Sequence, residues 1–251
     1  MQVYRRFSEL KEYHLEARDG RIGVPEALYF DDRDWKVRYL VVQTGIWIFG
    51  RDVLITPDRL KEVDETKKIL AVDLTREQVK NSPPVATERP VSRHYEEKYY
   101  LYYGWQPYWS SSPLTLPGIK PRSYSSPDEI NTVEQPEDNH LRSSREVTGY
   151  AIHSADGLAG HVRDFIVADE QWVIRYLEVD TGNWLPGRKI LVSPAWIKEV
   201  DWIRKEVTVN LSRAAIESAP EYDHDRLISR EYELQLFRHY STSAGNDGDG
   251  A

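Results

Sequence analysis

The amino-acid sequence contains one long pattern twice. Asp19-Gly20 recurs as Asp156-Gly157, and the offset of 137 residues then holds without a gap, so that residues 13–103 recur as residues 150–240. The repeated positions include Trp35, Arg38-Tyr39-Leu40, Thr44-Gly45, Trp47 and Gly50-Arg51, which recur as Trp172, Arg175-Tyr176-Leu177, Thr181-Gly182, Trp184 and Gly187-Arg188. This period exceeds the roughly 20 to 50 residues of a solenoid repeat. We therefore expect two copies of one small domain.

The duplication divides the chain into four parts. We predict a first domain at residues 1–109 and a second domain at residues 146–240. Between them, residues 110–145 are rich in Ser and Pro and lack a sustained apolar period, which is typical of a linker. Residues 241–251 offer no large apolar side chain to bury, so we expect a disordered tail there.

Short extended segments separated by turns fill each copy. In the first copy we predict strands at residues 13–17, 21–30, 35–43, 52–55, 60–64 and 69–74. No long helix interrupts them, which favours an antiparallel barrel, because closure removes exposed sheet edges. Thr75 then has the position of an N-cap for a short helix. The expected fold is mainly β, with two tandem small antiparallel barrels, each followed by short helices.

The alternation of apolar residues places Arg38 and Arg175 on the inward side of their strands. One interpretation is an anion or partner contact at a barrel mouth. The other, which we favour, is an ion pair with a carboxylate that both copies retain. The candidate carboxylate pairs are Asp32/Asp169 and Asp64/Asp201.

The order of turns, tryptophans and arginines resembles the PRC-barrel family. In the first copy the matching residues are Asp19-Gly20-x-x-Gly23, Trp35-x-x-Arg38-Tyr39-Leu40 and Thr44-Gly45-x-Trp47-x-x-Gly50-Arg51. In the second copy they are Asp156-Gly157-x-x-Gly160 and the stretch from Trp172 to Leu191. The resemblance covers residues 13–84 and 150–221. It implies PRC-type β-barrels used for protein contacts, without a shared catalytic set, as in free-standing tandem bacterial members.

Composition and motifs exclude several chemistries. The chain has no Cys, which removes disulfides, thiolate metal sites and Cys nucleophiles. Its seven His form no HExxH motif, and no Walker loop, G-x-G-x-x-G or G-x-S-x-G is present. Asp19, Asp32, Asp64 and their repeats adjoin turns, where Asp bonds local backbone, so we expect turn chemistry and not acid–base catalysis from them. We expect no enzyme activity, no catalytic residues, no metal and no cofactor.

The aromatic stretch after the first copy is the candidate binding site. Tyr95, Tyr99 and Tyr102 have the spacing of one helical face, and Gly104 ends the helix. One interpretation is a helix that packs on its own barrel or on the other barrel. The other is a partner-binding site, because Tyr and Trp are enriched at interface hot spots. Its candidate residues are Tyr99, Tyr102, Trp105, Tyr108 and Trp109.

The expected function is a non-catalytic protein-binding or assembly module with an unidentified protein partner. The duplicated barrels could also associate with each other or as a homodimer. The net charge of -8 disfavours nucleic acid as a partner. No apolar run spans a bilayer, so we expect a cytoplasmic protein. The family resemblance leaves two alternatives: a role in electron transfer like that of the photosynthetic reaction-centre H subunit, or a ribosome-maturation role like that of RimM.

Overall fold

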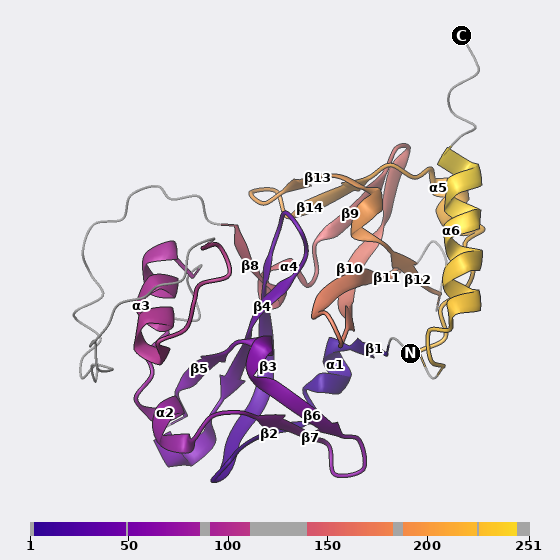
Figure 1. Cartoon of the computed structure of the whole chain (residues 1–251). Helices are drawn as coiled ribbons and strands as arrows, with labels where there is room; N and C mark the ends of the chain where they lie inside the picture. The colour runs from indigo at the N-terminus through magenta and orange to yellow at the C-terminus, as the bar shows by residue number, and fades with distance from the viewer. Residues whose placement is uncertain are drawn as a thin grey trace. The chain divides into compact units, whose positions relative to one another are not determined.

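The computed structural model describes residues 3–48, 50–85, 91–110, 140–182, 188–224 and 226–244, and Figure 1 labels their helices and strands. The chain divides into two compact units, which we name after the repeat that supplies most of each. The first-copy unit comprises Lys11–Arg33 and Val37–Ser143. The second-copy unit comprises Met1–Leu10, Asp34–Lys36 and Ser144–Ala251.

The first-copy unit is a sheet followed by two helices. Its strands are β2 (His14–Ala17), β3 (Gly20–Asp31), β4 (Val37–Gln43), β5 (Asp52–Ile55), β6 (Leu60–Asp64), β7 (Ile69–Val72) and β8 (Leu141–Ser143). Its helices are α2 (Arg76–Lys80) and α3 (Arg93–Tyr103), with 3-10 turns η1 (Gly45–Ile48) and η2 (Pro57–Arg59). These strands confirm a mainly β architecture.

The second-copy unit repeats this order. Its strands are β1 (Tyr4–Arg6), β9 (Ala151–Ser154), β10 (Gly157–Ala168), β11 (Val173–Asp180), β12 (Lys189–Val192), β13 (Ile197–Asp201) and β14 (Glu206–Val209). Its helices are α1 (Phe7–Leu10), α4 (Ser144–Val147), α5 (Arg213–Glu217) and α6 (Arg230–Ala244), with the 3-10 turn η4 (Pro194–Trp196).

The sheets differ from the predicted closed, wholly antiparallel barrels. Their hydrogen-bonded orders are β5-β4-β3-β2-β7-β6 and β12-β11-β10-β9-β14-β13. Each sheet contains one parallel pair, β2 with β7 and β9 with β14. Within the described residues no strand pairing joins β5 to β6 or β12 to β13, and in each copy a 3-10 turn beginning with proline separates these two strands along the chain. Barrel closure is therefore unconfirmed.

Each sheet has a seventh strand that comes from the other repeat. β1 precedes the first copy in sequence but pairs with β10 of the second. β8 precedes the second copy but pairs with β3 of the first. In Figure 1 the indigo β1 accordingly lies beside the orange β10. Apart from Ser110 and residues 140–145, the predicted linker lies outside the described residues, as does the predicted tail beyond Ala244.

The strand β4 is buried on both faces. Of its seven residues, only Arg38 and Gln43 are not buried. Tyr39 and Val41 belong to a cluster formed with the tyrosines of α3, so the helix covers the side of the sheet that they occupy. The sheet therefore positions α3, which carries the candidate site.

Residues that both copies retain fix turns and helix ends. Asp64 accepts the backbone N–H of Lys67 at 2.9 Å, which confirms the predicted turn chemistry at this position. Asp19 instead accepts the N–H of Arg76 at 2.7 Å, 57 residues away at the start of α2, and Asp32 lies 3.0 Å from Arg142, so the prediction of local turn bonds is wrong for these two. Arg51 donates to the carbonyl oxygens of Val79 and Lys80 at the end of α2. The equivalent contacts of the second copy join Asp156 to Arg213, Asp201 to Arg204 and Arg188 to Glu217.

Gly23 and its repeat Gly160 mark a close approach of two strands. A Cβ on Gly23 would lie 2.0 Å from the carbonyl oxygen of Gln43. A Cβ on Gly160 would lie 2.3 Å from the carbonyl oxygen of Asp180. The last glycine of the repeated Asp-Gly-x-x-Gly pattern is therefore required by the backbone packing of β3 on β4 and of β10 on β11.

We predict that Gly23→Ala destabilises the protein by roughly 1–3 kcal/mol, because the added methyl group must displace backbone atoms. Thermal unfolding followed by circular dichroism measures the effect. Gly45→Asn is the matched control: Gly45 has φ of +66° with nothing within 4 Å of its would-be Cβ, and Asn tolerates this conformation. Equal melting temperatures for the two variants would contradict the prediction.

Candidate functional site

The helix α3 has defined ends that follow from its sequence. The hydroxyl of Ser92 accepts the N–H of Tyr95 at its start. At its end Gly104 adopts a left-handed conformation with φ of 66°, and its N–H bonds the carbonyl oxygens of Leu101 and Tyr100. Gly104 favours this conformation because it has no Cβ. The predicted helix and its predicted stop are both present.

Two of the predicted partner-binding residues lie on the buried face of this helix. Tyr99 is fully buried and donates its hydroxyl to the carbonyl oxygen of Leu54 at 3.1 Å. Tyr102 is 8% exposed and donates to the carbonyl oxygen of Gln78 at 2.9 Å. Both side chains therefore attach α3 to the rest of the first-copy unit.

The other three, Trp105, Tyr108 and Trp109, are partly exposed and pack against the same cluster. Trp105 stacks on Tyr103 with centroids 4.1 Å apart and planes 10° apart. Trp109 meets Tyr100 edge-on at 5.3 Å. The structure thus brings these three residues together as an outer layer over the buried tyrosines.

A guanidinium lies over each ring of this outer layer. Arg59 lies 4.0 Å from the centroid of Trp105, and Arg38 lies 4.1 Å from that of Tyr108. Arg93 lies 4.0 Å from the centroid of Trp109. We call Arg38, Arg59, Arg93, Trp105, Tyr108 and Trp109 the aromatic–arginine surface. Cation–π contacts of this kind hold both partners in place.

Arg59 and Arg93 carry no pattern that marks them in the sequence. They come from η2 and from the first turn of α3, which are far apart along the chain. The predicted ion pair of Arg38 is present, but its partner is Asp31 at 3.2 Å, whereas Asp32 lies 3.0 Å from Arg142. Comparison of the two copies could not indicate Asp31, because its repeat position is Ala168.

Beneath this surface lies a buried carboxylate. Glu96 is 2% exposed and accepts hydrogen bonds from the hydroxyls of Tyr39 at 2.8 Å and Tyr108 at 3.0 Å. Arg93 lies 3.0 Å from its other oxygen. Burial raises the pKa of Glu96 above its ordinary value, although these three partners oppose the shift.

The second copy repeats this arrangement with one substitution. Glu233 accepts from Tyr176 at 2.8 Å, as Glu96 does from Tyr39. Its second donor is Tyr4 at 2.7 Å, from the exchanged strand β1. In both units a tyrosine of the sheet therefore bonds a glutamate of the following helix.

We predict that Tyr39→Phe destabilises the protein by roughly 1–3 kcal/mol, because it leaves a buried acceptor with one fewer donor. Tyr176→Phe should cost less, since Glu233 is more exposed than Glu96. Chemical denaturation of the two variants compares these free energies of unfolding. A larger loss in Tyr176→Phe would contradict the assignment.

We also predict a pH effect from Glu96. Its pKa is higher in the folded state, so the folded protein binds this proton more tightly than the unfolded chain. The resulting stability is complete below the ordinary glutamate pKa and is lost as the pH rises through the folded pKa. The melting temperature of the wild type should therefore fall relative to that of Glu96→Gln as the pH rises above the ordinary glutamate pKa. If the difference in melting temperature between the two proteins stays constant with pH, or changes in favour of the wild type as the pH rises, the raised pKa of Glu96 would be refuted.

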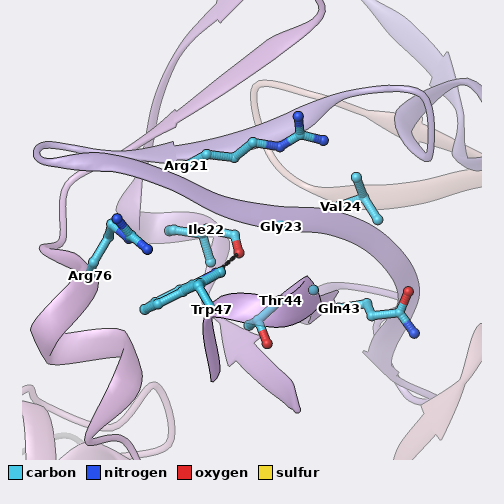
Figure 2. A pocket seen from close by; sticks show the side chains of 9 residues that line it. Arg21, Ile22, Gly23, Val24, Gln43, Thr44, Trp47 and Arg76 are labelled. Atoms are coloured by element: carbon cyan, nitrogen blue, oxygen red, sulfur yellow. Dashed lines mark hydrogen bonds between the residues drawn. The ribbon is translucent and has the colours of Figure 1, made fainter. Parts of the chain in front are cut away.

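A second candidate is an open pocket of about 410 Å³ in the first-copy unit. Figure 2 shows Trp47 below Ile22, with Arg76 beside the indole and Arg21 extending away from it. The Trp47 Nε1–H donates to the carbonyl oxygen of Ile22 at 2.6 Å, and the Arg76 guanidinium lies 4.3 Å from the ring centroid. The Arg76 guanidinium therefore brings a positive charge to the wall of the pocket, while the indole N–H is already bonded. The sequence predicted no pocket here: Trp47 belongs to the repeated motif, and nothing in the pattern marks Arg21 or Arg76 as its neighbours.

The described residues contain no group of three or more His, Asp or Glu side chains that could hold a metal ion. In the same part of the chain, no helix is long and apolar enough to cross a membrane. Comparison of the whole sequence with protein-family profiles and with curated proteins finds no match.

Proposed function

We propose that this chain is a non-catalytic tandem protein of the PRC-barrel type that acts as a protein-binding or assembly module. The repeated motifs support the family assignment, and the two equivalent strand orders support a small barrel-like sheet in each copy. The non-catalytic assignment is supported by the retained charged residues, since Asp19, Arg51 and Asp64 serve turns and helix ends.

The observation that carries the proposal is the aromatic–arginine surface. Its three aromatic rings are partly exposed, and each is covered by a guanidinium. Trp, Tyr and Arg are the residue types most enriched at interface hot spots. The buried tyrosines of α3 hold this surface in one arrangement, so a partner would bind without the cost of ordering it.

The charges on this surface indicate the chemistry of the partner. Arg38 and Arg93 have carboxylate partners within the first-copy unit, Asp31 and Glu96. For Arg59, which is partly exposed, the described residues show no ion pair. We therefore expect the partner to place a carboxylate at Arg59 beside an apolar group at Trp105. Tyr99 and Tyr102 support the surface from below.

We predict that a Trp105→Ala/Trp109→Ala variant loses the protein partners that the wild type captures. Tagged full-length protein is incubated with soluble and membrane fractions kept apart, and bound proteins are identified by mass spectrometry. Arg59→Glu should lose the same partners by charge reversal. Tyr108 is left unchanged because it bonds Glu96.

Trp196→Ala is the matched control. Trp196 is also partly exposed and packs on Phe237 and Tyr240, but it belongs to the second-copy unit. It should retain the partners. Partners that persist in the Trp105→Ala/Trp109→Ala variant would exclude the surface as their site. Ribosomal subunits or photosynthetic membranes among the bound material would instead support one of the two alternative functions.

A further inference from the structure

The two exchanged strands dock in the same way. β1 pairs with β10 through Tyr4↔Ala168, Arg5↔Val167 and Arg6↔Ile166. β8 pairs with β3 through Leu141↔Asp31, Arg142↔Phe30 and Ser143↔Tyr29. The offset of 137 residues relates the two registers residue by residue: Tyr4 corresponds to Leu141, and its partner Ala168 corresponds to Asp31. Two different segments therefore bind two equivalent strand edges with one geometry.

An ion pair accompanies each docked strand. Arg5 lies 3.1 Å from Asp169, and Arg142 lies 3.0 Å from Asp32. All four side chains are less than 20% exposed. A backbone bond extends each pairing: Asp169 N–H donates to Val3 at 3.1 Å, and Asp32 N–H donates to His140 at 2.9 Å. Asp32 and Asp169, retained in both copies, thus recognise the arginine of an incoming strand.

The segment that follows β1 adds apolar and polar contacts in the second-copy unit. Phe7 and Leu10 of α1 are 4% and 1% exposed. The backbone N–H of Ser8 donates to Asp164 at 3.2 Å, and the hydroxyl of Tyr4 donates to Glu233. Residues 3–10 therefore dock through contacts on both sides of the strand and do not rely on the connecting chain that follows Leu10.

In both cases the docked strand comes from outside the repeat that accepts it. The acceptor edge recognises the strand, its arginine and, at β10, its apolar anchors, and all of these contacts are made by residues 3–10 and 140–143 themselves. An identical strand on another molecule offers the same contacts, which is the condition for domain swapping. In the competing monomer the strand docks on its own chain and makes the same contacts. The monomer differs only in how the strand is connected to its acceptor, and its formation does not depend on protein concentration.

We infer that the β10 edge also accepts residues 3–10 of a second copy of this chain, so that two chains assemble by exchanging their N-terminal segments. The recognition elements are the β10 edge at Ile166–Ala168 and the carboxylate of Asp169. The inference concerns residues outside the aromatic–arginine surface, so the failure of either proposal leaves the other standing.

A charge exchange between two full-length chains tests this inference. Arg5→Glu alone places two carboxylates together, and Asp169→Arg alone places two guanidiniums together. When the two single variants are mixed, Arg5 of the Asp169→Arg chain can bind Asp169 of the Arg5→Glu chain. The two substituted side chains, a glutamate and an arginine, can also pair. The chains carry different affinity tags and are mixed at high concentration after mild warming, then separated by size with light-scattering detection.

We expect the mixture to form a species of twice the mass of one 29.3 kDa chain that carries both tags. The co-purified fraction should exceed that of either variant alone by about tenfold or more, since like charges oppose docking. Differently tagged wild-type chains should also co-purify, to an extent that increases with concentration. Absence of co-purification in both experiments would overturn the inference.

The double variant Arg5→Glu/Asp169→Arg in one chain controls for folding. It restores an opposite-charge pair within the molecule, so it should recover the wild-type melting temperature that each single variant loses. When the double variant is mixed with either single variant, the co-purified fraction should not exceed that of two differently tagged copies of the same single variant. A double variant as unstable as the single variants would show that this pair does not hold the strand, which would also overturn the inference.

Discussion

The long strand of each unit needs hydrogen-bonding partners along both edges. β10 runs over twelve residues, and β11 follows one edge through most of its length. β9 has only four residues and pairs with the other edge no further than His161. Open strand edges invite pairing with other chains. β1 fills the remaining edge, and β8 does so for β3, so the limits of each folded unit cannot coincide with the limits of the repeat.

A polar link attaches the following helix to each sheet. Tyr39 bonds Glu96 and Tyr176 bonds Glu233, inside contacts that are otherwise largely apolar. A buried carboxylate is satisfied only where its donors meet it, so this link specifies one placement of the helix among many that would bury similar apolar area. The aromatic–arginine surface depends on that placement, because its rings stack on tyrosines of α3.

Local signals predicted most elements of the fold. Alternating apolar residues and turn residues located β2 to β7, and Thr75 and Gly104 marked a helix start and a helix end, because each signal acts within a few residues. β1 and β8 escaped prediction since three residues are too short to show a period and their partners are distant in sequence. Arg59 reaches Trp105 only through the tertiary fold, and the pairing of Arg38 with Asp31 has no repeated counterpart to reveal it.

The strand exchange also sets an order for folding during synthesis. The N-terminal segment leaves the ribosome first, but its acceptor at Ile166–Ala168 follows only after roughly 8 to 30 s at ordinary elongation rates. The first-copy unit must wait for Leu141–Ser143 before its sheet is complete. Neither unit can therefore finish folding until more than half of the chain has been translated, and the nascent protein carries apolar Phe7 and Leu10 unburied throughout that interval.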